Sequence, residues 1–202
     1  MEDQEILQNI KDGALDDLYF YSNRGKEERE RWVVKELLKF LKITHEHSEI
    51  ISHEQRSKTD VEFRECRFQI KEIPDPCILR SKYYKDQYNA IKSARKLEDI
   101  ELPAAVAHDI PEIARMYDLV FLESQKLSES DVYLNTKNKL DLIFYITRTR
   151  ASLIGIKDIN AKDFVHLGWR SISCLNAKQA VVLFASKNAP TFLKANEEQI
   201  FG

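Results

Sequence analysis

The feature that most constrains the fold is a continuous apolar run, Leu-Ile-Phe-Tyr-Ile-Thr, at residues Leu142–Thr147. A strand with one wetted face alternates apolar and polar side chains, whereas this run offers almost no polar face to water. Such a strand is buried on both faces, so helices must cover its sheet on both sides. The run therefore predicts a central strand in a layered α/β structure.

The remaining periodicities fit this picture. Helical spacing of apolar residues predicts helices over Glu27–Leu41 and Ile78–Lys96, and Asp109 is a good N-cap for a third helix with Pro111 in its first turn. Strands and a final helix are predicted elsewhere: a short strand at Ile50–Ile51, a hairpin of Trp169–Leu175 and Ala180–Ala185, and a terminal helix from Pro190. We expect one domain over residues 1–202, an α/β (α+β) fold with a mixed sheet flanked by helices.

Composition excludes several functional classes. With 31 basic and 33 acidic residues the net charge is -2, which argues against a wholly basic protein that coats nucleic acid. The five glycines are too far apart for a dinucleotide-binding turn or a P-loop, so no cofactor-binding residues are assigned. Three cysteines without a CxxC pair suit reduced thiols. We expect a cytoplasmic protein without membrane contact, and nothing indicates an oligomer.

Two short alternating segments, Asp60–Arg64 and Phe68–Glu72, carry the most informative pattern. Paired as a hairpin that turns at Glu65–Cys66, they would bring together residues whose numbers sum to 131, so that Asp60 lies opposite Lys71. Directly opposed side chains on one face lie about 5 Å apart at Cβ. One face would then hold two carboxylates, an amide and an ammonium group: Asp60, Glu62, Gln69 and Lys71.

Such a group suits metal-assisted cleavage of a phosphodiester. Hard oxygen ligands bind Mg²⁺, which keeps several waters and binds through few protein groups together with a substrate phosphate. A lysine nearby can orient or deprotonate the attacking water. The alternative is structural, because an Asp opposite a Lys is commonly a surface ion pair that contributes under about 1 kcal/mol.

The same residues resemble a known pattern. Asp60 followed by Gln69-x-Lys71, after a helix that carries Glu30, resembles the PD-(D/E)xK nuclease superfamily. Longer stretches, over a core of about residues 27–193, resemble a bacterial family of unknown function whose members are classed as endonucleases: Glu28–Val33, Gly168–Ser173, Val182–Ala185 and Ala189–Leu193.

This resemblance implies a restriction-endonuclease-like core and a Mg²⁺- or Mn²⁺-dependent endonuclease that acts on DNA, with RNA as an alternative substrate. It implies four catalytic residues: Lys71, Asp60, Gln69 and Glu30. It also implies metal ligands: Asp60, Gln69 and the Ile70 carbonyl, with Glu62 as a compensating carboxylate. Two positions depart from the pattern, because Thr59 replaces a proline and Gln69 replaces a carboxylate. Loss of that charge leaves open an inactive nuclease fold that binds nucleic acid or protein.

A basic stripe follows the two strands. At helical period the segment Ile78–Lys96 places four lysines within about a quarter-turn of one another: Lys82, Lys85, Lys92 and Lys96. A stripe of this kind can bind a phosphate backbone with little sequence preference. The solvated face of an amphipathic helix explains the same pattern, and the sequence leaves the two interpretations open.

Overall fold

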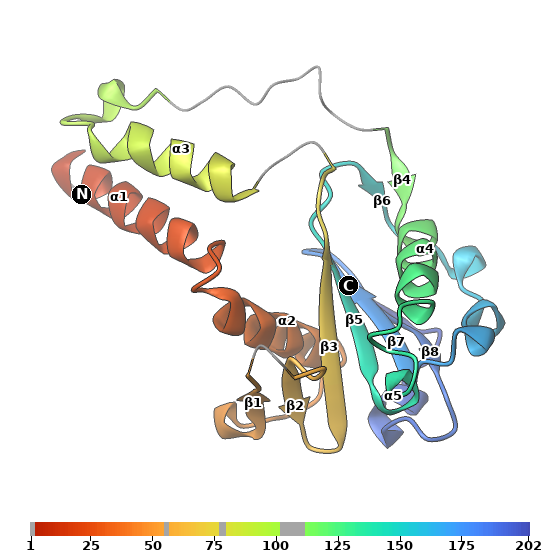
Figure 1. Ribbon diagram of the computed structural model, residues 1–202. Helices are drawn as coiled ribbons and strands as arrows, with labels where there is room; N and C mark the ends of the chain where they lie inside the picture. The colour runs from red at the N-terminus through yellow and green to blue at the C-terminus, as the bar shows by residue number, and fades with distance from the viewer. Residues whose placement is uncertain (1–2, 55–56, 77–79, 102–111) are drawn as a thin grey trace. The chain divides into compact units, whose positions relative to one another are not determined.

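The computed structural model describes residues 3–54, 57–76, 80–101 and 112–202, and the chain forms two compact units (Figure 1). The first unit comprises Met1–Arg29 and Pro76–Pro111, and the second comprises Glu30–Asp75 and Glu112–Gly202. The first unit is therefore made of two separate stretches of sequence, and residues 30–75 of the second unit lie between them along the chain. A single domain over residues 1–202 stays a prediction.

The first unit is built on two helices, α1 (Asp3–Phe20) and α3 (Arg80–Lys92). They run antiparallel, because Tyr21 stacks on Tyr84 with ring centroids 4.1 Å apart while the Lys11 ammonium donates to the Ala94 carbonyl at 2.7 Å. The sequence predicted α3 but not α1. Within α1 only Leu7 is buried, so the sequence has no apolar stripe there that would predict a helix.

The second unit contains a mixed sheet with strand order β1-β2-β3-β5-β7-β8-β9. The three central strands β3, β5 and β7 are parallel, and the other neighbours pair antiparallel. The bounds are β1 Ile50–Ser52, β2 Val61–Phe63, β3 Cys66–Ile73, β5 Asp141–Ile146, β7 Ser171–Leu175, β8 Ala180–Ala185 and β9 Ile200–Phe201. The predicted mixed α/β sheet is thus confirmed.

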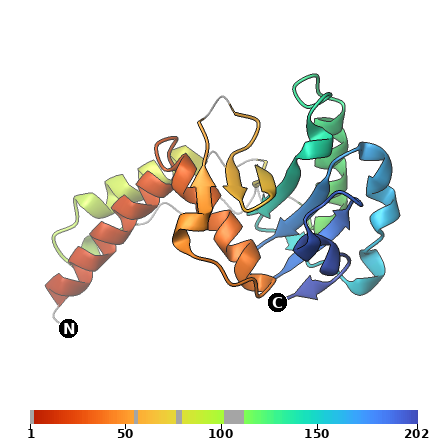
Figure 2. The same cartoon turned by 90° about the horizontal axis from the view of Figure 1, so that it is seen from below.

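Helices cover both faces of this sheet (Figures 1 and 2). Helix α2 (Lys26–Phe40) packs its apolar stripe on the face that carries Phe63, Phe68 and Ile143. On the other face, α4 (Met116–Ser128) and the 3-10 helix η6 (Ala161–Leu167) pack against a second apolar cluster. Strand β5 lies between the two clusters, and its residues 142–144 are fully buried, as the apolar run predicted.

The shorter elements complete the chain. They are the 3-10 helices η1 His47–Glu49, η2 Leu97–Asp99, η4 Lys137–Lys139 and η5 Ile156–Asp158, and the terminal helix α5 Thr191–Ala195. The terminal helix follows Pro190 as predicted. The start predicted at Asp109 for the third helix lies outside the described residues, and α4 begins at Met116. None of the helices in the described ranges combines the length and apolar character that a membrane crossing requires.

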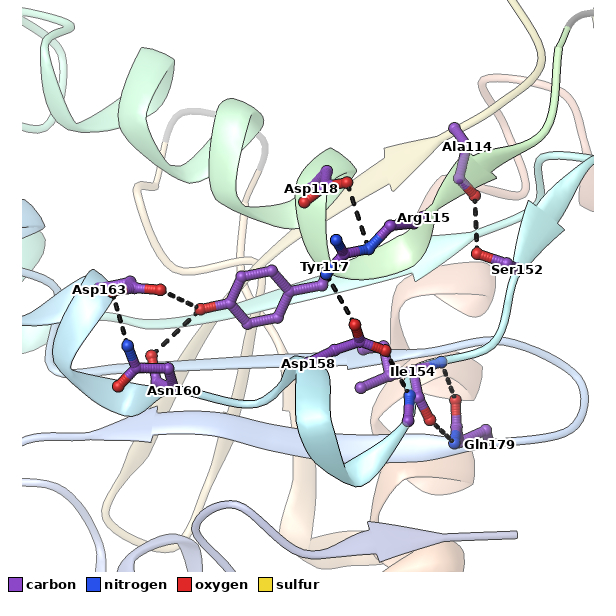
Figure 3. A network of polar contacts seen from close by, with 11 residues as sticks. Ala114, Arg115, Tyr117, Asp118, Ser152, Ile154, Asp158, Asn160, Asp163 and Gln179 are labelled. Atoms are coloured by element: carbon purple, nitrogen blue, oxygen red, sulfur yellow. Dashed lines mark hydrogen bonds and ion pairs between the residues drawn. The ribbon is translucent and has the colours of Figure 1, made fainter.

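A polar network fixes the chain where it re-enters the second unit (Figure 3). A small parallel ribbon pairs β4 (Ala114–Arg115) with β6 (Ala151–Ser152). The Arg115 guanidinium also donates to the Asp158 carboxylate at 2.7 Å, so the ribbon is joined to η5. The Tyr117 hydroxyl, at the start of α4, donates to Asp163 at 2.8 Å, so α4 is joined to η6. Burial and the bond to Asp163 raise the pKa of this hydroxyl well above its ordinary value.

A buried ion pair joins the amino ends of β5 and β7. Asp141, the first residue of β5, is fully buried and its carboxylate pairs with the Arg170 guanidinium. The same carboxylate accepts from the Ser171 hydroxyl at 2.7 Å and from the Arg67 N–H at 3.0 Å. Arg170 in turn donates to the Glu65 carbonyl at 3.1 Å. These contacts fasten the β2–β3 hairpin to the parallel strands.

Candidate functional site

The hairpin of β2 and β3 has a different register from the predicted one. Val61 pairs with Phe68 and Phe63 with Cys66, so the numbers of paired residues sum to 129 instead of 131. The turn is the two-residue loop Arg64–Glu65, and Arg64 adopts the left-handed backbone conformation with φ 52°. The predicted pairing of Asp60 with Lys71 is therefore wrong. A shift of two residues leaves every side chain on its predicted face.

Beyond Phe68 the two strands separate. Strand β3 continues from Gln69 to Ile73, and within the described residues no strand pairs with that stretch on the β2 side. Asp60 lies at the point of separation, where its own N–H donates to the Phe68 carbonyl at 2.8 Å. We call Asp60 together with this open edge of Gln69–Ile73 the fork. It contains three of the predicted site residues and the carbonyl of a fourth.

Within the fork the Asp60 carboxylate is held by β3. The same carboxylate oxygen accepts from the Gln69 side-chain amide and, at 2.8 Å, from the Ile70 N–H. Asp60 is 8 % exposed and Gln69 is 4 % exposed. A buried carboxylate must be compensated by hydrogen bonds or by a cation. The two donors supply such hydrogen bonds, and both come from β3.

The fork also presents oxygen donors suited to a metal ion. In a strand the N–H and C=O of one residue point to the same side. Because the Ile70 N–H points to Asp60, the Ile70 carbonyl points to the same open edge. Gln69 directs its nitrogen to Asp60, and rotation of the amide would place its oxygen there instead. Asp60, Ile70 and Gln69 therefore fit a Mg²⁺ ion that takes few protein ligands and keeps several waters.

The fork does not contain a metal site built from charged or imidazole side chains alone, as far as the described residues show. Among the described residues, no three His, Cys, Asp or Glu side chains lie close enough together to hold a metal ion. Any ion at the fork would therefore depend on one carboxylate and on neutral oxygens.

Lys71 lies on the same face of β3 as Gln69. Its parallel neighbour on β5 is Phe144, a member of the apolar cluster under α4. The Lys71 ammonium lies over the ring of Tyr133, 5.8 Å from the ring centroid. Gln69 and Lys71 thus share the α4 side of the sheet, as alternation predicted, whereas Lys71 does not pair directly with Asp60.

Glu62 takes part in a separate contact. Its cross-strand neighbour is Arg67 instead of the predicted Gln69, and one of its carboxylate oxygens lies 3.0 Å from His53 Nε2. This pair is partly exposed, at 35 % for His53 and 40 % for Glu62. Glu62 as a compensating metal ligand stays a prediction.

Two further acids lie on the opposite face of the sheet. Glu30 is 8 % exposed and lies on α2, whose apolar stripe covers the face away from Gln69 and Lys71. Glu72 points to this α2 face as well, and one of its oxygens accepts from the Thr147 hydroxyl at 2.6 Å. Glu30 is thus buried toward the sheet as predicted, but on the side of Glu72. Its catalytic role stays a prediction.

The basic stripe belongs to the first unit. Lys82, Lys85 and Lys92 are exposed on α3, and the Lys92 ammonium lies 5.7 Å from the Tyr88 ring centroid. The helix ends at Lys92, so Lys96 follows in irregular backbone and does not share the helical period. The predicted stripe therefore keeps three of its four lysines on one helix.

The sequence reasoning missed Tyr133. It lies in the turns between α4 and β5, a polar stretch without helical or strand period, and no local signal connects it with Lys71. Only the packing of that stretch against the sheet brings its ring to the lysine.

Comparison with known proteins identifies a family. A family model described as "Putative endonuclease, protein of unknown function (DUF1780)" matches residues 2–202, nearly the whole chain. No curated protein matches this sequence.

One solved structure shares the fold. It is described as "Structure of Protein of Unknown Function PA4535 from Pseudomonas aeruginosa strain PAO1, Monooxygenase Superfamily". The likeness has a TM-score of 0.63 and 21 % sequence identity, and covers 100 % of this chain and 96 % of that one. At this identity the likeness shows the arrangement of helices and strands and carries no statement about chemistry.

Proposed function

This chain belongs to the DUF1780 family, and we propose that it is a metal-dependent endonuclease that hydrolyses phosphodiester bonds of DNA at the fork. The observation that carries the proposal is the meeting of the Asp60 carboxylate, the Gln69 amide and the outward Ile70 carbonyl where β2 and β3 separate. The family description points to the same activity. The topology around the fork, a helix followed by three antiparallel strands and then a parallel strand, agrees with a PD-(D/E)xK core.

The residues of the fork divide the work. Asp60, Ile70 and Gln69 would hold Mg²⁺ or Mn²⁺, and the bound ion would polarise the phosphate and acidify a water. Lys71 lies one side-chain repeat along β3 from Gln69 and would orient the attacking water or balance charge on the phosphate. The Ile70 N–H keeps the Asp60 carboxylate turned toward the open edge.

The test is cleavage of plasmid, single-stranded DNA and RNA in the presence of Mg²⁺ or Mn²⁺, with a chelator as the blank. We expect cleavage by the native chain and its loss in Asp60→Asn and Lys71→Ala. Matched controls are Asp118→Asn and Lys139→Ala, exposed residues of the same unit that should leave cleavage unchanged. Cleavage that survives Lys71→Ala, or no cleavage of any substrate by the native chain, would refute the proposal.

A second candidate is a catalytically silent fold that binds nucleic acid or protein. The hydrogen bond from the Gln69 amide to Asp60 favours it, because this contact satisfies the carboxylate without a metal ion. Gln69→Glu separates the two. Two adjacent carboxylates repel each other, so a divalent ion should stabilise the variant far more than the native chain. Calorimetric binding of Mn²⁺ to the native chain that is lost in Asp60→Asn supports the nuclease, and binding only in Gln69→Glu supports the silent fold.

The lysines of α3 complete the proposal. Exposed ammonium groups along one helix would bind backbone phosphates, and each such contact changes the slope of log affinity against log salt by about 0.9 on duplex DNA. We expect the triple variant of Lys82, Lys85 and Lys92 to alanine to weaken DNA binding and to lower that slope by about 2 to 3. Lys96→Ala, off the helix, serves as the comparison. An unchanged slope in the triple variant would exclude α3 from the interface.

A further inference from the structure

The ammonium group of Lys71 rests on an aromatic ring. It lies 5.8 Å from the centroid of Tyr133, within the range at which a cation is attracted by the negative face of an aromatic ring. Tyr133 is only 7 % exposed, and Lys71 is half-buried. Contacts of this kind strengthen as the groups lose water, so a half-buried lysine gains more from the ring than an exposed one would.

The ring of Tyr133 is itself fixed in place. Its centroid lies 5.3 Å from that of Trp169, which is 2 % exposed and donates its indole N–H to the Ser124 carbonyl at 3.2 Å. The backbone around Tyr133 is a succession of tight turns. The Tyr133 N–H donates to the Ser130 carbonyl at 3.0 Å, and the Tyr133 carbonyl accepts from Lys137 N–H at 2.9 Å. The ring therefore offers Lys71 a rigid surface.

We infer that Tyr133 is a positioning residue for Lys71, holding the lysine ammonium on the α4 side of the fork, where Gln69 also lies. A lysine side chain has four rotatable bonds and loses much conformational entropy when it is held in one place. The Tyr133 ring holds the ammonium in one place before substrate binds, so part of this entropy is already lost in the free protein. This inference rests on the proposed function for its catalytic consequence and on the Tyr133–Lys71 contact alone for its structural one.

The catalytic consequence is a selective fall in turnover. Removing the ring should lower kcat by about five-fold, the equivalent of one cation–π contact, and leave KM nearly unchanged. Phenylalanine has the same negative ring face, so Tyr133→Phe should keep kcat. Urea unfolding of the same variants gives the control. The free energy of unfolding that Tyr133→Leu costs should be smaller in a Lys71→Ala background, where the ammonium is already gone, than in the native chain. A merely structural role of Tyr133 would cost the same in both backgrounds.

The structural consequence can be measured without activity. In NMR spectra of the full chain with ¹³C-labelled lysine, the Lys71 Hε protons should be shifted upfield by the ring. They are assigned by their absence in Lys71→Ala. We expect the shift in the native chain and in Tyr133→Phe, and its loss in Tyr133→Leu. Tyr133→Met, whose flexible side chain fills irregular space, is the second variant if Tyr133→Leu does not fold.

These two measurements separate the inference from the proposed function. If the native chain cleaves no nucleic acid, the proposed function fails while the Hε shift still decides whether Tyr133 holds Lys71. Equal Hε shifts in Tyr133→Phe and in the leucine or methionine variant would overturn the inference. So would an equal cost of Tyr133→Leu in urea unfolding with and without Lys71.

Discussion

The buried pair of Asp141 and Arg170 supports a quantitative prediction. The Asp141 side chain is 1 % exposed and the Arg170 side chain 14 % exposed. Burial alone would lower the pKa of the Arg170 guanidinium, but the hydrogen bond and charge of Asp141 outweigh this, so the pKa is raised. The charge of the guanidinium is thus compensated inside the protein by its partner.

Asp141→Asn keeps the shape of the side chain and removes its charge. One carboxylate oxygen becomes an NH₂ group and faces donors from Arg170, Ser171 or Arg67 that need an acceptor. Breaking a buried ion pair from one side costs about 3 to 5 kcal/mol, because the other charge is left uncompensated. With a urea m-value of about 2 kcal/mol/M, the unfolding midpoint should fall by about 2 M.

The assay is urea unfolding followed by tryptophan fluorescence. Both tryptophans, Trp32 and Trp169, belong to the second unit, so the signal reports the unit that contains the pair. Asp118→Asn is the control. Its partner Arg115 is 3.4 Å away and both side chains are more than half exposed, so its cost should be below about 1 kcal/mol.

Two results would refute the reasoning. The first is a midpoint for Asp141→Asn no lower than that of Asp118→Asn. The second concerns the double variant Asp141→Leu/Arg170→Met, which removes both charges and should be more stable than either single variant. A double variant that is less stable than both singles would show that the hydrogen bonds, not the uncompensated charge, dominate.

Three other predictions test the second unit. Burial raises the pKa of the Cys174 thiol to about 12, whereas an unfolded thiol titrates near pH 8.5. Native Cys174 should therefore resist a thiol reagent at pH 8, as alkylation rates would show. Its contribution to the free energy of unfolding should be constant below about pH 8.5 and decline above it, as urea unfolding at a series of pH values would show. Asp75→Asn should cost about 1.5 to 3 kcal/mol in urea unfolding, because Asp75 is 6 % exposed and its carboxylate accepts both the Thr149 N–H and the Thr149 hydroxyl; a cost below 0.5 kcal/mol would contradict this. Phe144→Ala, at a fully buried position of β5, should cost about 3 to 5 kcal/mol, and an unchanged midpoint would show that the core repacks.

Local pattern predicted the elements that carry a clear period. The alternating residues of β2 and β3 point to the faces that the sequence assigned, and the stripe of Val33, Val34 and Leu37 is buried on α2. These assignments need only the geometry of one helix or strand, in which side-chain direction repeats every 3.6 or 2 residues. Helix α1 was not predicted, because most of its side chains are exposed or only partly buried and form no apolar stripe.

The candidate site was predicted in composition and not in geometry. The spacing of Asp60, Gln69 and Lys71 is in the sequence, but their distances depend on a turn in which Arg64 adopts a left-handed conformation. Neither this turn, Arg64–Glu65, nor the predicted one, Glu65–Cys66, contains a glycine or an asparagine, so no residue in the sequence marked where the hairpin turns. In the observed register Asp60 accepts a hydrogen bond from Gln69 instead of pairing with Lys71. The Lys71 ammonium lies over the ring of Tyr133.

By itself, the sequence determined that this chain has a central strand buried on both faces and a cluster of polar side chains on one face of a short hairpin. Both follow from side-chain alternation, which is a property of a single strand. Tertiary structure alone decided that α2 brings Glu30 to the opposite face, that the lysines of α3 belong to a separate unit, and that a ring from a loop 62 positions later meets Lys71. Those choices depend on which distant segments bury their apolar surface together, and no local period encodes them.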